Sequence, residues 1–361
     1  MKKIYISVTA VILALTVTAC GKTDNEQAAA PSLSPTTVNE TKPVSSPSAE
    51  TTAKFYFTGD EGGSITKIDA IQNKVTDTIK AEGSVHNVQV SPNGKILGAT
   101  LVPKMQGNMN HGGTEMKGIA LFYDTSTNQL IKKVEVGNHP AHIVFTSDQK
   151  YALVTNNEDN SVSVIDSSTY QVAKTIPTGK GPHGFRTSAD AKFAYVANMG
   201  EDSVSVLDLT SMKEVRQIKV GGTPVTTGVT SDGKLLVVPL NAENAVAIVD
   251  LATDKVEKVP VGEGPAQVYI QSDDKFAIVA NQGNEKKPSN SITKIDLVTK
   301  KAVATVETGK GSHGVVISKD NKWIYVTNMF DNTVSVVDNM QNKEIAEFKV
   351  GQTPNGISIM P

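Results

Sequence analysis

The sequence predicts an all-β fold, a seven-bladed β-propeller formed by residues 54–361. One observation is a repeat that ends in glycine after valine or threonine and mostly spans 41–47 residues, near the roughly 40–50 residues of a four-stranded blade. Another is that each repeat contains short stretches in which β-branched and other residues alternate, as in strands. The closing glycines are Gly137, Gly179, Gly221, Gly262, Gly309 and Gly351, and Gly83 begins a longer repeat of 54 residues.

Each repeat contains four predicted strands in a fixed order. In the repeat 179–221, an apolar stretch follows His183 and ends at a turn at 189–190. Residues 192–198 form the second strand, 203–208 the third and 218–221 the end of the outer strand. Glycine, aspartate and asparagine separate these stretches, as expected for turns. No long helical pattern competes with this interpretation.

One further repeat is divided between the two ends of this region. Residues 351–357 resemble the first strand of a repeat, and 55–58, 64–69 and 76–80 supply the other three. Together with the six complete repeats, this gives a seventh blade whose closure leaves the ring without free sheet edges. The aspartate that ends each third strand recurs in every blade, so it indicates turn chemistry and not a catalytic array: Asp69, Asp124, Asp166, Asp208, Asp250, Asp296 and Asp338.

The first 53 residues have a different composition. Residues 1–19 combine a basic start with a short apolar run, the pattern of an export signal, and 17–20 (Val-Thr-Ala-Cys) resemble a bacterial lipobox. That resemblance implies cleavage before Cys20, acylation of Cys20 with fatty acids such as palmitate, and a protein anchored on the extracytoplasmic face of a membrane. An ordinary signal peptide and a buried core thiol are the alternatives. Residues 20–53, rich in Ser, Thr, Pro and Ala, predict a disordered linker.

Composition excludes several kinds of chemistry. A single cysteine cannot form an internal disulfide, a thiolate zinc cluster, an iron–sulfur centre or a c-type haem attachment. The formal net charge of −2 would become −4 after removal of residues 1–19, so we expect no nucleic-acid partner.

Two repeats carry motifs that point to a family. Residues 195–198 (Tyr-Val-Ala-Asn) and 325–328 (Tyr-Val-Thr-Asn) precede the alternating segments 203–206 and 333–336. In these features the region 54–361 resembles the YVTN-type β-propeller repeats of bacterial and archaeal surface proteins, in the cytochrome d1-like superfamily. The resemblance implies the fold and leaves the function open, because such relatives include lactonases, haem domains, DNA-binding periplasmic proteins and surface proteins.

Histidines gather at the predicted mouth of the central channel. An alignment on the serine five residues downstream places a histidine at the start of the innermost strand in four of seven blades. We therefore expect a ring of seven side chains there, with three consecutive histidines able to approach one ion. The aligned residues are His86, His142, His183, Thr226, Gln267, His313 and Asn355.

Methionines are predicted to face the same mouth. The insertion 103–117 is polar and glycine-rich, and it contains three of the nine methionines and one of the six histidines. Thioether and imidazole together form a soft ligand set that favours copper, especially Cu(I). The predicted metal ligands are His86, His142, His183, His313, Met105, Met109, His111, Met116, Met199 and Met329.

Other interpretations of this face remain open. The histidines can be part of the repeat architecture, His139 can be solvated on the rim, and methionine-rich loops also bind proteins. A metal-free module would bind a protein or glycan through top loops that include 282–290. A lactonase-like hydrolase would use His183 and His313 with an acid, namely Glu201, Asp202 or Asp331, although no nucleophile-elbow motif supports it. The sequence leaves catalytic activity undecided.

Overall fold

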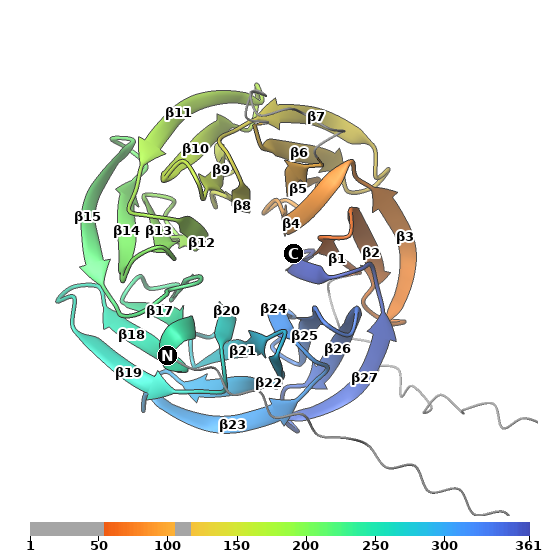
Figure 1. Cartoon of the computed structure of the whole chain (residues 1–361), viewed down its shortest axis with the longest axis vertical. Coiled ribbons are helices and arrows are strands. Elements are labelled where there is room, and N and C mark those ends of the chain that lie inside the picture. The colour runs from red at the N-terminus through yellow and green to blue at the C-terminus, as the bar shows by residue number, and fades with distance from the viewer. Residues whose placement is uncertain (1–53, 105–116) are drawn as a thin grey trace, which may run out of the picture. The chain divides into compact units, whose positions relative to one another are not determined.

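Residues 54–104 and 117–361, which the computed structural model describes, form seven four-stranded antiparallel sheets around a central axis (Figure 1). This confirms the predicted seven-bladed propeller. The only helix among the described residues is one 3₁₀ turn, η1 (Asn241–Glu243). None of these residues belongs to a helix with the length and apolar character needed to span a membrane. The predicted signal peptide, Cys20 and linker lie outside the described residues, as do Met105, Met109, His111 and Met116.

The blades are numbered in chain order, innermost strand first. Blade 1 is β4 (Gly83–Val90), β5 (Ile96–Pro103), β6 (Ile119–Asp124) and β7 (Leu130–Glu135); blade 2 is β8 (Pro140–Phe145), β9 (Tyr151–Asn156), β10 (Ser161–Asp166) and β11 (Gln171–Pro177); blade 3 is β12 (Pro182–Thr187), β13 (Phe193–Asn198), β14 (Ser203–Asp208) and β15 (Lys213–Lys219). Blade 4 is β16 (Gly228–Val229), β17 (Leu235–Leu240), β18 (Ala245–Asp250) and β19 (Val256–Pro260); blade 5 is β20 (Pro265–Ile270), β21 (Phe276–Asn284), β22 (Lys287–Asp296) and β23 (Lys301–Glu307); blade 6 is β24 (Ser312–Ile317), β25 (Trp323–Asn328), β26 (Thr333–Asp338) and β27 (Lys343–Lys349). The split blade is β28 (Pro354–Ile359), β1 (Phe55–Asp60), β2 (Ser64–Asp69) and β3 (Lys74–Lys80).

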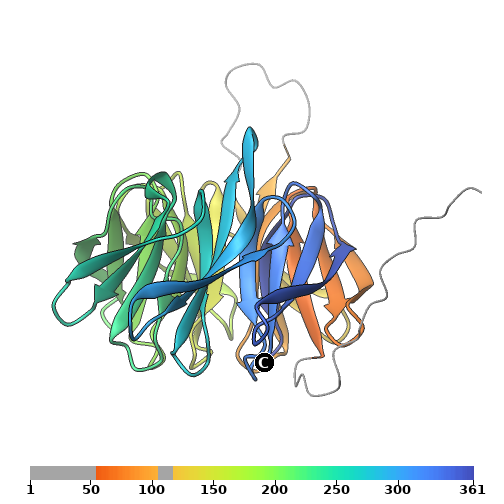
Figure 2. The ribbon, with the colours of Figure 1, turned by 90° about the horizontal axis from the view of Figure 1, so that it is seen from below.

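The split blade closes the ring as expected. β28 pairs with β1 in antiparallel register, with Thr58 opposite Ile357 and Phe57 opposite Ser358. Closure pairs the C-terminal strand with the first described strand, so β1 is paired on both of its edges, by β28 and by β2. Blade 5 departs most from the common pattern because β21 and β22 are longer, and their hairpin rises from the face on which second strands end (Figure 2).

Hydrophobic cores lie between neighbouring blades. One core joins Leu153 and Val162 of blade 2 to Phe185 and Val196 of blade 3, all four without exposed surface. The inner three strands are covered on both sides by adjacent blades, so their alternating residues are buried on both faces. The outermost strands are mostly exposed; β15, for example, buries fully only one of its seven residues. Each blade is therefore stabilised chiefly by its two neighbours.

Three threonines in second strands connect successive inner strands. Thr100, Thr155 and Thr327 each accept a hydrogen bond from an inner-strand amide of their own blade, at 2.8–3.0 Å. Each hydroxyl then donates to an inner-strand carbonyl of the next blade, at 2.7–3.0 Å. These threonine bridges fix the inner strands that carry the predicted site residues.

The repeated aspartates are turn residues, as expected. In every blade, an oxygen of the carboxylate that ends the third strand accepts hydrogen bonds from two backbone amides of the following turn. These are Asx turns, and they lie on exposed loops. The array therefore has a structural role.

The end of the second strand differs in the split blade. In blades 2, 3, 5 and 6 a buried asparagine donates from Nδ2 to two hydroxyls of the third strand. In the split blade Asp60 holds this position and accepts from Thr58, Ser64 and Thr66. Burial raises the pKa of Asp60 to about 6, although the three hydroxyl donors oppose this shift.

We predict that Asp60→Asn stabilises the protein at neutral pH. A carboxyl group whose pKa is higher in the folded state stabilises the fold below its unfolded pKa of 3.8, and this contribution is lost as the pH rises through about 6. Asparagine has no charge to bury, so the free energy of unfolding near pH 7.5 should rise by about 1–3 kcal/mol, with little change near pH 4. Denaturant titrations at both pH values measure this difference.

The matched control is Asn198→Asp, which places a carboxyl group at the equivalent position of blade 3. It should lower stability near pH 7.5 and recover part of the loss in acid. Equal stability of Asp60→Asn and the wild-type chain at neutral pH would contradict the assigned cost of burying the Asp60 charge.

Candidate functional site

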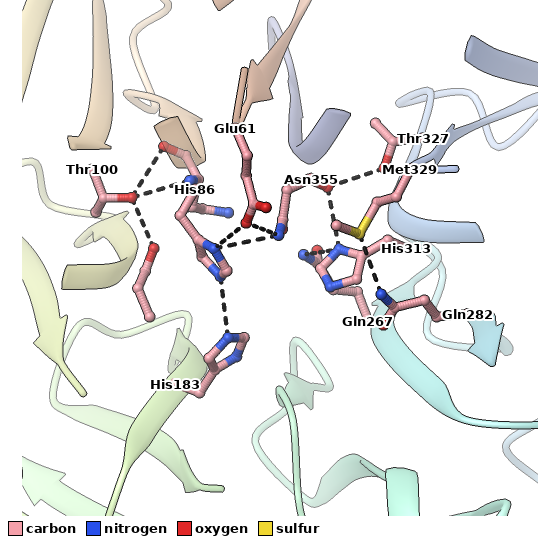
Figure 3. Close-up of polar contacts among 12 residues, drawn as sticks. Glu61, His86, Thr100, His183, Gln267, Gln282, His313, Thr327, Met329 and Asn355 are labelled. Carbon is pink, nitrogen blue, oxygen red and sulfur yellow. Dashed lines mark hydrogen bonds and ion pairs between the residues drawn. The ribbon is translucent and has the colours of Figure 1, made fainter. Parts of the chain in front are cut away.

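Three histidines of consecutive blades meet at the mouth of the channel. His86 is on β4, His142 on β8 and His183 on β12, and one ring nitrogen from each lies within 4.8 Å of the other two. The Nε2 atoms of His86 and His183 are 3.1 Å apart (Figure 3). The structure thus brings together three of the predicted ligands, separated by up to 97 residues in the chain.

His142 reaches this cluster from a different strand position, so the predicted alignment is wrong by one residue in blade 2. Its amide donates to Thr155, as the amides of Asn87 and Gly314 donate to the equivalent threonines. The residue equivalent to His183 is therefore Ala141. The same correction applies to Thr226 and Gln267. Pro224 and Pro265 pair with the ends of their second strands, as Pro182 does, so the residue equivalent to His183 is the one directly after each proline.

The altered register gives His142 a particular direction. Successive strand residues point to opposite sides, and at this position a Cβ on Gly184 would meet the inner strand of the next blade, 2.4 Å from Thr226. His142 therefore points toward blade 3 and has no exposed surface. Ala141 occupies the mouth of blade 2 with only a methyl group, and His86 and His183 contact each other across it.

Hydrogen bonds orient two of the rings. Nδ1 of His86 lies 2.8 Å from Oε1 of Glu61, and Nδ1 of His183 lies 3.0 Å from the carbonyl oxygen of Val225. A carbonyl and an ionised carboxylate only accept, so both Nδ1 atoms carry hydrogen. The two Nε2 atoms face each other at 3.1 Å, so a proton or a metal ion is required between them. Neither ring nitrogen of His142 has a hydrogen-bond partner among the described residues.

The electrostatics of the site favour neutral imidazoles beside a charged carboxylate. Burial, followed by the charges of His183 and His86, holds the pKa of His142 well below its usual range. Burial and His86 lower the pKa of His183 to about 3, although the Val225 carbonyl opposes the shift. Burial alone would raise the pKa of Glu61, but the hydrogen bond and charge of His86 outweigh it and lower it to about 2. Neutral His142 and His183 can donate lone pairs to a Lewis acid at ordinary pH.

His313 belongs to a second polar group on the same channel. Its Nδ1 lies 3.3 Å from Gln267 Nε2 and from the carbonyl oxygen of Asn355, and burial followed by the His86 charge lowers its pKa to about 4. Met329, on the same blade as His313, accepts from Gln282 Nε2 at 3.3 Å (Figure 3). The Asn355 side chain donates to Glu61 at 2.9 Å and so joins this group to the three histidines.

Met199 and His139 belong to neither group. The Met199 side chain is partly exposed, and no contact links it to the cluster. The His139 side chain is half exposed and lies 3.4 Å from Glu158, in agreement with a solvated position on the rim. The predicted loop ligands are outside the described residues.

Sequence reasoning missed Glu61. This residue follows Asp60 at the end of the second strand of the split blade, in the same place as Met199 and Met329 in blades 3 and 6. The rule that placed those methionines at the mouth applies equally to Glu61. Applied to the split blade, it would have found a carboxylate next to His86.

Comparisons with known proteins agree on the fold. Residues 117–274 and 271–360 match the family described as YNCE-like beta-propeller, and no curated protein matches the chain. Among solved structures, Kuenenia stuttgartiensis hydrazine synthase is similar with a TM-score of 0.66 and 22% identity over 77% of this chain and 90% of that one. Dihydro-heme d1 dehydrogenase NirN in complex with DHE is similar with a TM-score of 0.62 and 15% identity, over 87% of this chain and 77% of that one. At these identities the likeness shows the fold alone.

We predict that His86→Ala raises the pKa of Glu61 from about 2 toward its ordinary value of 4.5. The variant removes the His86 hydrogen bond and charge, which lower this pKa most, and leaves the burial that raises it against the smaller effects of His313 and Asn355. Carboxyl ¹³C chemical shifts recorded against pH measure the change. His313→Ala, which removes only a more distant charge, should shift the Glu61 pKa far less; a Glu61 titration unchanged in His86→Ala would refute the assigned pairing.

Proposed function

This chain belongs to the YNCE-like β-propeller family, and for this member we propose that the propeller binds a metal ion through His86, His142 and His183. The observation that carries the proposal is the approach of two Nε2 atoms to 3.1 Å, beside a third buried imidazole without a hydrogen-bond partner among the described residues. Buried polar groups are normally satisfied, and a metal ion would satisfy all three at once.

The hydrogen bonds at Nδ1 of His86 and His183 support this proposal. Histidines that bind metals usually donate their other ring N–H to a carboxylate or a backbone carbonyl, which fixes the tautomer and the ring orientation. Glu61 accepts this hydrogen bond from His86, and the Val225 carbonyl accepts it from His183. Metal–nitrogen bonds of about 2.0–2.1 Å require ligand atoms that are close together, so only small side-chain movements are needed from the present spacing.

We propose copper as the metal. Sites made of nitrogen ligands bind Cu²⁺ more tightly than other divalent first-row metals, including Zn²⁺, and thioethers add preference for Cu(I). The described part of the chain supplies three imidazoles. The methionines of the insertion, Met105, Met109 and Met116, together with Met199, are our candidates for the additional soft ligand.

The site would then work outside the cytoplasm. We propose that the chain is a lipoprotein, cleaved before Cys20 and anchored through it on the extracytoplasmic face of a membrane, because residues 1–20 combine an export signal with a lipobox-like end. The linker of residues 20–53 would have a mean reach of about 30 Å from that surface.

Metal analysis tests the copper proposal directly. The full chain, purified without an affinity tag, is loaded with Cu(I), Cu(II) or Zn(II) and dialysed against a competing chelator. We expect near-stoichiometric copper in the wild type. Glu61→Gln, which changes only the hydrogen-bond partner of a ligand, should lower the copper affinity 10- to 100-fold. His142→Ala removes a ligand itself and should therefore lower the copper affinity more than 100-fold.

His139→Ala is the matched control, since it removes a half-exposed histidine of the same blade from outside the cluster. Its copper content should equal that of the wild type, and circular dichroism should show that all variants are folded. No retained copper in the wild type, or equal retention by His142→Ala, would overturn the proposal.

A separate prediction concerns Cys20. In cells, Cys20→Ser should abolish incorporation of labelled palmitate and leave the signal peptide attached, because acylation and cleavage both depend on the thiol. Fractionation, metabolic labelling and intact-mass measurement give the result. Unchanged labelling in Cys20→Ser would refute the anchor and leave the metal proposal unaffected.

A further inference from the structure

One charged side chain occurs among seven equivalent inner-strand residues at the end of the channel farther from the histidines. Each blade contributes one of these residues, at the same register position beyond the bulge, and the inner strands surround the central axis (Figure 1). We call these residues the lower ring. They are Gln89, Val144, Arg186, Gly228, Tyr269, Val316 and Ser358.

Five residues of the lower ring line a cavity of about 320 Å³, together with neighbours that include Phe145, Ser147 and Thr187. A second cavity of about 310 Å³ adjoins it and shares Gln89 and Tyr269. Ligand sites in proteins span roughly 300–1,000 Å³, so each cavity has room for a small molecule.

Arg186 lacks the ion-pair partner that a partly buried guanidinium normally has. Its hydrogen bond is donated from Nη1 to the carbonyl oxygen of the adjacent Phe185, at 2.9 Å. No ion pair of the described residues includes it, and burial lowers its pKa with only the Tyr269 phenol opposing. The other arginine of the chain, Arg216, is paired with Asp254 on the surface. A guanidinium has five N–H donors, so Arg186 keeps most of its donors for a ligand.

We propose that the lower-ring cavity binds a small organic monocarboxylate through Arg186. The planar guanidinium fork matches a carboxylate with two parallel hydrogen bonds, and one positive charge balances one negative charge. The Tyr269 hydroxyl and the Gln89 amide supply further hydrogen bonds, while Val144, Phe145 and Val229 form an apolar wall for the hydrocarbon part. A dianion such as phosphate would leave one charge uncompensated in a partly desolvated cavity, so it should bind less well.

This site is separate from the three histidines. His183 and Arg186 are on the same strand, β12, but the histidine is near the start of the strand, at the mouth, and the arginine is near its end. The lower ring contains none of the proposed metal ligands. Binding of a carboxylate therefore does not depend on binding of copper.

Calorimetric titration of the chelator-treated full chain with butyrate, benzoate and inorganic phosphate at constant ionic strength tests the proposal. We expect saturable binding of at least one monocarboxylate with Kd below about 10 mM, and at least tenfold weaker binding of phosphate. Arg186→Gln should weaken carboxylate binding by at least tenfold, and Tyr269→Phe by roughly 2- to 10-fold.

Arg216→Gln is the matched control and should bind as the wild type does. If Arg186→Gln fails to fold, the milder Tyr269→Phe variant still provides the measurement. Equal carboxylate affinity in folded Arg186→Gln, no saturable binding of either monocarboxylate, or stronger binding of phosphate would each overturn the proposal.

Discussion

The pairing of β28 with β1 is the constraint on which the rest of this molecule depends. It closes seven sheets into a ring, so that every blade is packed between two others and every inner strand has a fixed distance from the axis. It also assembles part of the site. Asn355 is on β28 and Glu61 directly follows β1, and both contact His86 of the next blade. Closure thus places the carboxylate that orients one of the proposed ligands.

Within the closed ring, two hydrogen-bonding motifs recur in blades whose inner side chains differ. The threonine bridges join successive inner strands, while Asx turns shape the loops on the other side. Because these motifs bond to backbone groups of the inner strands and turns, the side chains at the inner positions are free to vary. His142 occupies a position that is glycine in blades 3 and 6. A histidine here adds a third imidazole to the mouth, where His86 and His183 contact each other.

The two halves of the channel differ in electrostatic character. At the mouth, burial keeps His142 and His183 neutral, and the one nearby anion, Glu61, is held in its charged form by His86. In the lower half, Arg186 carries a charge without a counter-ion among the described residues. A cation would be attracted to one end and an anion to the other. The two ends of one channel would therefore suit ligands of opposite charge.

The sequence by itself determined the fold, the number of blades, the division of the seventh blade and the role of the repeated aspartates, because each depends on local periodicity or turn chemistry. It failed on the register of His142. Thr146 makes the turn hydrogen bonds that Ser91 and Ser188 make elsewhere, and since the two hydroxyl residues are interchangeable there, an alignment on serine shifted blade 2 by one residue. Only the tertiary structure decided which side chains meet. The contacts of His86 with His183 and with Glu61, and of Arg186 with its cavity, join positions of different blades, and no local pattern encodes the direction in which a side chain crosses from one blade to another.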